Sequence, residues 1–236
     1  MSAEPVAKRA VVFFDGQNLF HAAREAFGCP FPNYDPIALA TSICNQQGWT
    51  LSGIRFYTGV PAPTDNPFWH QFWSNKLADL GKTGAFTYSR PLRYQNRTFR
   101  LPDGTQHSHL VGHEKGVDIR IALDVINVAL DGICDVAVIF SQDQDFSEVA
   151  DEVRTIARRQ QRWFKLASAF PSSPTYRNRR GVNKTDWIRI DKATYDQCVD
   201  PKDYRAAFPQ VPSAASTSRR SMSNAPPVTA PEGSNS

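Results

Sequence analysis

AVVFFDGQN, residues 10–18, is the stretch that decides the fold. Its first five residues are apolar, as in a fully buried strand, and Asp15-Gly16 breaks that strand into a turn. Residues 18–27 then carry a short helical pattern that ends at Gly28. A buried strand that runs directly into a helix is typical of an α/β fold, in which a parallel sheet is covered on both faces.

The same alternation of strand and helix patterns continues along the chain. Further strands are predicted at residues 51–60, 85–89, 135–140 and 163–167. Further helices are predicted at residues 35–47, 67–80, 116–130 and 147–160. Two neighbouring apolar stripes on the helix over residues 116–130 indicate that it packs against the sheet. We therefore predict a mostly parallel sheet with helices on both faces.

Composition and length limit the class of protein. The chain has 236 residues, of which 41% are hydrophobic, so one compact domain with a real core is expected. A net charge of +4 is too small to identify a partner. The longest apolar runs have five residues, against about 20 in a membrane span. The start, MSAEPVAKRA, has no apolar signal segment. We therefore expect a cytoplasmic protein with no membrane partner.

The domain organisation follows from a change in composition near the C-terminus. Residues 206–236 contain five prolines, seven serines and six alanines and almost no large apolar side chain. This segment is predicted to be a disordered tail. The expected domain covers residues 8–190, and residues 191–205 form a C-terminal extension.

Four aspartates are placed to meet at one edge of the predicted sheet. Asp15 follows the first strand, Asp143 and Asp145 follow the strand over residues 135–140, and Asp118 opens a buried helix. Ligands of open α/β sheets bind beyond the carboxyl ends of the strands, where the strand order reverses. Carboxylates packed together raise one another's pKa, and a divalent cation removes that cost. Hard oxygen ligands favour Mg²⁺ or Mn²⁺.

Each aspartate taken alone also has a structural interpretation. An aspartate after a strand is often a turn residue or a helix N-cap, and Asp143 or Asp145 fits that role for the following helix. Asp118 is favoured near a helix N-terminus by the helix dipole. The hypothesis of a metal site depends on the set being brought together.

Three segments resemble the signatures of the NYN domain, a family of the PIN-like nuclease group. They are FDGQNL at residues 14–19, KGVD at residues 115–118 and SQDQDF at residues 141–146. The resemblance implies a Rossmann-like three-layer α/β/α sandwich with an acidic metal site. For active members of the family, it also implies hydrolysis of RNA by a metal-dependent endoribonuclease.

Carried over residue by residue, the resemblance assigns roles to five positions. Asp15, Asp118, Asp143 and Asp145 would hold Mg²⁺ or Mn²⁺ and would be catalytic. Asn18 would orient a ligand, water or phosphate near the metal.

One residue departs from the family pattern. The family commonly has a small residue, often glycine, where this chain has Gln142. We expect the larger side chain to narrow the site.

A basic and aromatic segment, RPLRYQNRTFR at residues 90–100, precedes the KGVD motif. Arginine binds phosphate and aromatic rings stack on unpaired bases, so this segment is a candidate hairpin or loop for binding single-stranded RNA. The alternative is an edge hairpin with solvated arginines. The candidate substrate-binding residues are Arg90, Arg93, Tyr94, Arg97 and Arg100.

Two further basic groups follow in the second half of the chain. The arginines at positions 154, 158, 159 and 162 have helical spacing and are interpreted as a solvated face. Residues 176–180 (YRNRR) and Lys184 form a loop group that either reaches phosphates or is soluble surface.

Two other function classes stay open. One is a non-catalytic RNA-binding module that keeps the acidic pocket. The other is a small-molecule enzyme, because the chain also resembles bacterial NADH-dependent monooxygenases that hydroxylate an N-heteroaromatic such as 6-hydroxy-3-succinoylpyridine in nicotine degradation. No GxGxxG nucleotide motif opens the first strand–helix turn. An iron triad would have to use His107, His109 and Glu114, and we interpret these histidines as loop residues.

Overall fold

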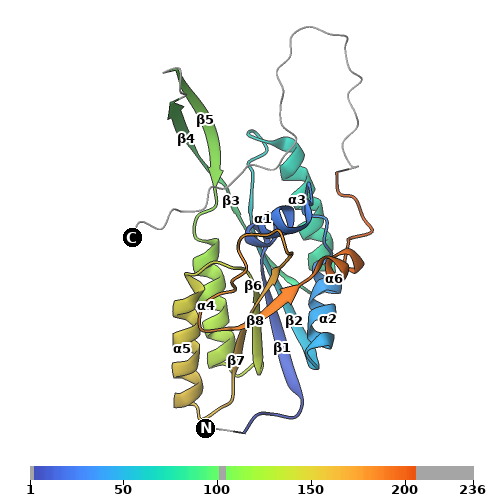
Figure 1. The fold of residues 1–236 in the computed structure, drawn as a ribbon, viewed down its shortest axis with the longest axis vertical. Helices are drawn as coiled ribbons and strands as arrows, with labels where there is room; N and C mark the ends of the chain where they lie inside the picture. The colour runs from blue at the N-terminus through green and yellow to red at the C-terminus, as the bar shows by residue number, and fades with distance from the viewer. Residues whose placement is uncertain (1–2, 101–104, 206–236) are drawn as a thin grey trace.

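The computed structural model describes residues 3–100 and 105–205, which form a layered α/β structure (Figure 1). Its main sheet is parallel throughout, with the strand order β3-β2-β1-β6-β7-β8. These strands are β1 (Lys8–Asp15), β2 (Trp49–Val60), β3 (Phe86–Pro91), β6 (Val136–Phe140), β7 (Lys165–Pro171) and β8 (Asp186–Ile190). The predicted α/β class with a mostly parallel sheet is therefore confirmed.

Helices cover both faces of this sheet, which completes the predicted three-layer arrangement (Figure 1). One face carries α1 (Gly16–Phe27), α2 (Pro36–Gln46), α3 (Pro67–Lys82) and the short α6 (Lys192–Gln197). The opposite face carries α4 (Val117–Leu130) and α5 (Phe146–Arg159).

Strand β1 divides the core between these faces by simple alternation. Ala10, Val12 and Phe14 pack into the core beneath the first group of helices, whereas Val11 and Phe13 pack beneath α4 and α5. This is the two-residue period of a strand that is buried on both sides. The alternation directs the next odd-numbered residue, Asp15, toward the side of α4.

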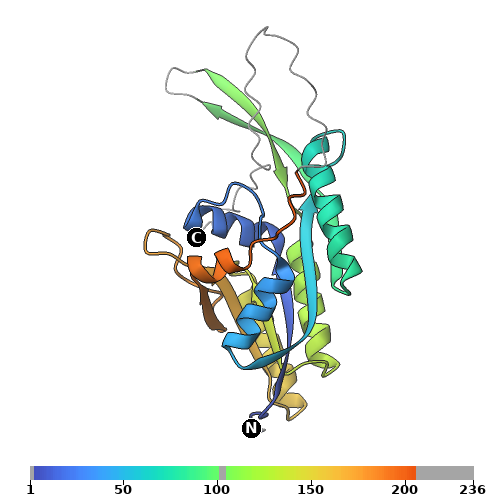
Figure 2. The same cartoon turned by 90° about the vertical axis from the view of Figure 1, so that its right-hand side faces the viewer.

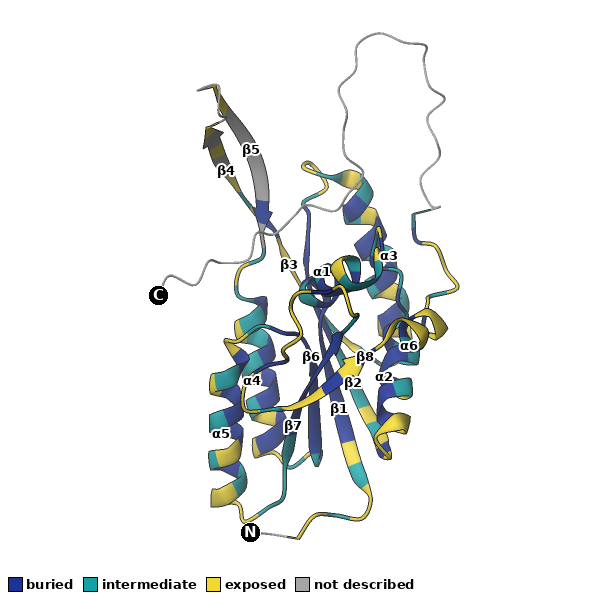
Figure 3. Ribbon diagram, in the orientation of Figure 1, coloured by how far each residue is buried: buried dark blue, intermediate teal, exposed yellow. Residues whose placement is uncertain are grey.

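Helix α4 buries one of its two apolar stripes fully and the other only in part. Val117, Ile121 and Val125 pack against the sheet. Two members of the second stripe, Ile119 and Leu130, are 62% and 49% exposed. The prediction that this helix packs against the sheet is confirmed, although α5 and the sheet cover only part of its apolar surface. Figure 3 shows the buried strands between the partly exposed helices.

The basic segment forms a separate antiparallel hairpin. Its strands are β4 (Arg93–Arg100) and β5 (Gln106–His113), which pair with each other and not with the main sheet. In both Figure 1 and Figure 2 the hairpin stands out from the layered body. The segment is thus a hairpin and not a loop, a form that both interpretations of its arginines allow.

Beyond β7 the chain contributes more to the core than the sequence patterns indicated. Strand β8 adds to the sheet edge, and Ile190 and Tyr195 enter the core. Lys76 is buried and donates to Asp200 Oδ2 at 2.7 Å and to the carbonyl of Tyr34 at 2.8 Å. The predicted tail, residues 206–236, lies outside the described residues. Within residues 3–100 and 105–205, no helix is both long and apolar enough to cross a membrane.

Candidate acidic site

The main sheet reverses its strand order between β1 and β6. From β1 the chain first builds outward through β2 and β3, and then returns to the other side of β1 and builds outward through β6, β7 and β8. This is the switch point at which open α/β sheets bind ligands. Phe14 and Phe140 are paired in the register, so Asp15 and Ser141 follow them side by side. Strands β1 and β6 are therefore neighbours in the sheet, which brings the residues that follow them to one edge.

Asp15 lies at the junction of β1 and α1 and is fixed by two hydrogen bonds. Its Oδ1 accepts from the backbone N of Asn18 at 3.1 Å, so it caps helix α1. Its Oδ2 accepts from the hydroxyl of Ser141 at 3.1 Å. Gly16 permits this close junction, because a Cβ there would lie 2.9 Å from the carbonyl oxygen of Tyr57. Asp15 is therefore both the helix cap and a member of the acidic edge.

Burial and neighbouring acids raise the pKa of Asp15. The residue is 9% exposed. Loss of hydration is the largest cause and raises the pKa to about 7, although the hydrogen bonds from Asn18 and Ser141 oppose the rise. The charges of Asp143 and Asp118 are smaller contributions to the same rise. Asp143 and Asp118 are therefore close enough to Asp15 for their charges to act on its carboxylate.

Glu114 is a fourth acid at this edge, and the motif analysis did not include it in the site. Both carboxylate oxygens are buried and have no hydrogen-bond partner in the described structure. Burial is the main cause that raises its pKa well above the ordinary value, followed by the charge of Asp15. The backbone N–H of Gly59 is near enough to the carboxylate to lower this pKa, although it does not meet hydrogen-bond geometry, and the charge of Asp118 raises the pKa. A bound cation would offset the cost of burying this carboxylate without a hydrogen-bond partner.

The predicted aspartates have different exposures and contacts. Asp118 lies in the first turn of α4, and Asp143 is half-buried in the turn after β6. The Asp143 Oδ1 accepts from the backbone N of Asp145 at 3.0 Å. Asp145 is exposed at the N-cap position of α5, and no side-chain cap bond is recorded there. Of the predicted aspartates, Asp143 and Asp118 are the two whose charges raise the pKa of Asp15.

The donor set fits a hard divalent cation in its chemistry. It consists of carboxylate oxygens, two of which are buried without partners at Glu114. Among the described residues, however, no three His, Cys, Asp or Glu side chains are gathered closely enough to hold an ion. Coordination would therefore draw the carboxylates closer together than they lie here.

Asn18 and Gln142 connect the two loops of the site. The backbone N of Gln142 donates to Asn18 Oδ1 at 2.9 Å. The amide oxygen of Asn18 is thus engaged in holding the loop after β6. The Gln142 side chain makes its contacts with the loop that follows β7.

The basic residues of the hairpin segment are placed in different ways. Arg90 is exposed, and its Nη1 donates to the carbonyl of Lys115 at 3.2 Å, beside the KGVD motif. Arg93 and Arg100 are exposed along β4. The Tyr94 hydroxyl is buried without a recorded partner. The side chain of Arg97, and those of His107 and His109, lie outside what the structure describes.

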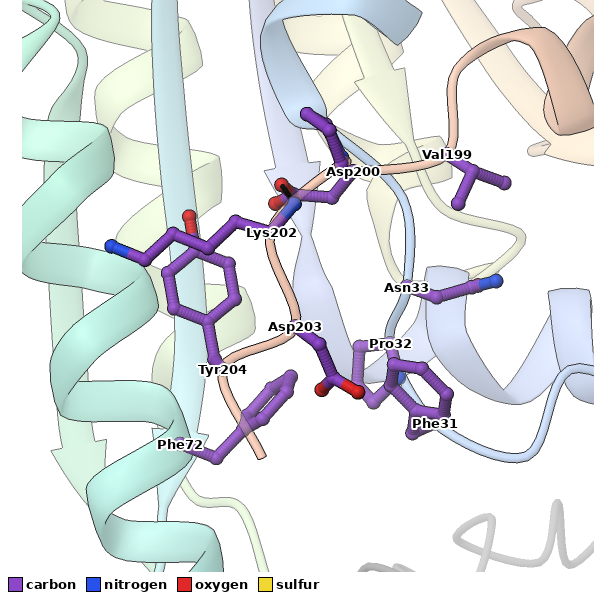
Figure 4. A pocket seen from close by; sticks show the side chains of 10 residues that line it. Phe31, Pro32, Asn33, Phe72, Val199, Asp200, Lys202, Asp203 and Tyr204 are labelled. Atoms are coloured by element: carbon purple, nitrogen blue, oxygen red, sulfur yellow. Dashed lines mark hydrogen bonds between the residues drawn. The ribbon is translucent and has the colours of Figure 1, made fainter. Parts of the chain in front are cut away.

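A small cavity lies outside the candidate acidic site, and none of the acids of that site lines it (Figure 4). It has a volume of about 100 Å³ and lies between the segment before α2, helix α3 and residues 199–204. Phe31, Phe72 and Tyr204 supply much of its lining. Its charged residues are already paired, since Lys202 contacts Asp79 and Asp203 binds Arg205.

Comparison with known proteins places this site in a family. The NYN domain profile matches residues 9–161, so the chain belongs to the NYN domain family, as its three motifs predicted. That family is part of the PIN-like nuclease superfamily, and its domains are generally nucleases. A solved protein of unknown function from Vibrio parahaemolyticus is similar, with 20% identity and a TM-score of 0.47. The similarity covers 80% of this chain and 97% of that one. No curated protein matches the chain.

Proposed function

We propose that this NYN protein is a metal-dependent endoribonuclease that hydrolyses RNA phosphodiester bonds at the carboxyl edge of the sheet. The observation that carries this proposal is the group of acids at the strand-order switch. The charges of Asp143 and Asp118 raise the pKa of Asp15, and those of Asp15 and Asp118 raise the pKa of Glu114. Accumulated negative charge of this kind destabilises the site unless a cation binds.

The residues that would hold Mg²⁺ or Mn²⁺ are the acids of this edge. Asp15, Glu114, Asp118 and Asp143 are joined by their electrostatic effects. Asp145, exposed at the start of α5, completes the proposed set from the solvent side. A bound divalent ion would lower the pKa of a water molecule and neutralise charge on the scissile phosphate.

Hydrolysis itself needs no redox partner. The oxygen of a water molecule forms a bond to phosphorus, the bond from phosphorus to a ribose oxygen breaks, and that ribose oxygen takes up a proton. In this chain the hydrogen bonds from Ser141 and Asn18 keep the Asp15 carboxylate in one orientation. Neither histidine nor serine is required as a nucleophile.

Single-stranded RNA is the proposed substrate because of the basic hairpin. Arg93 and Arg100 are exposed on β4, and the second strand of the hairpin, β5, leads directly into Glu114 and the KGVD motif. Arginines that precede the acidic edge can bind the phosphate backbone while a neighbouring phosphodiester reaches the acids. We also propose substrate contacts for Arg90, Tyr94 and Arg97.

The decisive experiment is cleavage of a labelled single-stranded RNA with Mn²⁺, in parallel with Asp143→Asn. We expect cleavage by the wild type that EDTA abolishes and that the variant lacks. Asp131→Asn, an exposed aspartate after α4, is the matched control and should cleave normally. Equal cleavage by Asp143→Asn would place the activity elsewhere or in a contaminant.

The other outcomes separate the remaining function classes. RNA binding without cleavage by the wild type would replace the nuclease with a binding module. No binding or cleavage, together with consumption of NADH in the presence of an N-heteroaromatic substrate, would overturn the proposal in favour of a small-molecule monooxygenase.

A further inference from the structure

The loop between β7 and β8, residues 172–185, is held against the acidic edge by side chains of the SQDQDF motif. We infer that this loop is a second phosphate-binding segment for the nucleic acid, and that Gln142 and Gln144 are the positioning residues that fix it. The inference rests on the proposed function, because it concerns the substrate of the same site.

Gln142 uses its whole side-chain amide to bind the loop. Its Nε2 donates to the carbonyl oxygens of Asn178 at 3.1 Å and Arg180 at 2.8 Å. Its Oε1 accepts from the hydroxyl of Tyr176 at 2.9 Å. Gln142 is only 6% exposed, so these bonds are made away from bulk water, where leaving them unmade is costly. The side chain therefore does not narrow the acidic site by lying free within it.

Gln144 adds a second set of bonds on the same side. Its Nε2 donates to the carbonyls of Gln142 at 3.0 Å and Gly181 at 3.2 Å. Its Oε1 accepts from the backbone N of Asn183 at 3.1 Å. The two glutamines thus hold the loop from Tyr176 to Asn183, while Asp143 between them acts on Asp15. A glycine at position 142 would provide none of these side-chain bonds.

The loop that is held in this way presents unused positive charge. Residues 177–180 are exposed. Arg179 is engaged within the loop, where it donates to the carbonyls of Tyr176 and Pro174. In the part of the chain that the structure describes, the guanidinium groups of Arg177 and Arg180 have no recorded hydrogen bond or ion pair. Guanidinium groups with free donors are suited to phosphate oxygens.

The arginines of α5 provide the contrast. Arg154 pairs with Asp151, and Arg162, just after the helix, donates to the carbonyls of Cys134 and Ala129 at 2.6 Å. Arg158 and Arg159 lie in the last turn of α5, whereas the acidic edge lies at its first turn. A helix of this length separates them by roughly 20 Å. Arg158 and Arg159 therefore serve as a control for Arg177 and Arg180, because replacing either pair removes the same amount of charge.

Binding of a fluorescein-labelled single-stranded RNA in EDTA, followed by anisotropy, tests the inference without cleavage. We expect R177Q/R180Q to bind about 10-fold more weakly, with the salt slope reduced by about 1.4 for two lost phosphate contacts. R158Q/R159Q loses the same charge and should bind RNA within about twofold of wild type. The reason is that only Arg177 and Arg180 are proposed to contact the RNA phosphates.

Gln142→Ala tests the positioning role, because it removes the tether and keeps every arginine. We expect weaker RNA binding together with faster amide hydrogen exchange at Val182 and Asn183, which report the loop. Gln142→Glu is the second variant, because it keeps the side-chain size and the acceptor for Tyr176 but loses both amide donors. With Mn²⁺ present, all loop variants should raise KM and leave kcat near the wild-type value.

The outcomes separate this inference from the proposed function. If the wild type cleaves RNA but R177Q/R180Q and the α5 control behave alike, the loop has no such role and the nuclease stands. If Gln142→Ala binds RNA as the wild type does, Gln142 is not a positioning residue. If the wild type neither binds nor cleaves RNA, both proposals fail.

Discussion

The hydroxyl of Ser141 links the two halves of the acidic edge. It donates to Asp15 Oδ2 at 3.1 Å and accepts from the backbone N of Asp143 at 3.1 Å. One side chain therefore fixes an acid at the end of β1 relative to an acid after β6. The bond to Asp15 also lowers the pKa of that acid, against the effect of burial.

Ser141→Ala should weaken metal binding by removing this link. Without the hydroxyl, Asp15 holds its proton more tightly and must lose it to bind a cation. We expect Mn²⁺ affinity to fall about 10-fold, equivalent to the loss of one hydrogen bond to a charged group. Titration with Mn²⁺ by electron paramagnetic resonance measures the free ion directly.

The control is Ser147→Ala, a serine in the first turn of α5. Its side chain makes no recorded contact with Asp15, so Mn²⁺ affinity should stay unchanged. Equal affinities for wild type and Ser141→Ala would show that the serine has no part in the metal site.

Asp15→Asn should change how the stability of the metal-free protein depends on pH. The pKa of Asp15 is about 7 in the folded protein, raised first by burial, against an ordinary value of 3.8 for an aspartate. Between these values the folded state binds more protons than the unfolded state, so this residue stabilises below about pH 4 and that stability is lost as pH rises through 7.

Urea unfolding in EDTA from pH 4.5 to pH 8 measures this effect. We expect the stability of Asp15→Asn relative to wild type to rise with pH, by an amount on the order of a few kcal/mol. A difference that stays constant over this range would contradict the raised pKa.

Much of the sheet could be predicted because its strands are buried on both faces. The apolar run of β1 is a pattern that local sequence alone can reveal, whereas the side on which Val11 and Phe13 pack is seen only in the structure. Strand β8 was not predicted, because it is an edge strand with exposed polar residues and only two buried positions.

The candidate site was predictable only where its residues follow strands. Asp15 and Asp143 were found because parallel strands end at one edge. Glu114 was missed as a site residue, because it follows the polar strand β5 and nothing local shows that its carboxylate is buried. The Gln142 bonds to Asn178 and Arg180 connect residues 36 and 38 positions apart, and no sequence pattern encodes such contacts.

Glu114→Gln should make the metal-free protein more stable and the enzyme less active. The variant removes a buried acid whose oxygens have no partner. At pH 8 we expect stability to rise by about 1 kcal/mol, because an uncompensated buried acid is costly. RNA cleavage with Mn²⁺ should fall at least about 10-fold, because the amide cannot supply the negative charge.

Stability and cleavage must therefore be measured on the same preparation. Glu148→Gln, which changes an exposed glutamate of α5, is the control and should alter neither quantity. A Glu114→Gln protein that is destabilised and fully active would assign Glu114 to the fold alone.

Lys76→Met should show that residues 198–205 are part of the folded domain. Lys76 is 2% exposed and donates to Asp200 Oδ2 at 2.7 Å, which joins α3 to the segment after α6. Removing one member of a buried pair leaves the other charge unpaired and costs about 3–5 kcal/mol. Guanidinium unfolding followed by circular dichroism gives this change directly.

Two further variants make the result specific. Lys76→Met combined with Asp200→Leu should recover most of the lost stability, because neither charge then remains buried. Lys202→Met removes an exposed ion pair with Asp79 and should cost less than about 1 kcal/mol. If Lys76→Met is no more destabilising than Lys202→Met, the pair does not hold this segment on α3. Full loss in the double variant would instead show that the side chains matter through packing, because restoring charge balance would then have no effect.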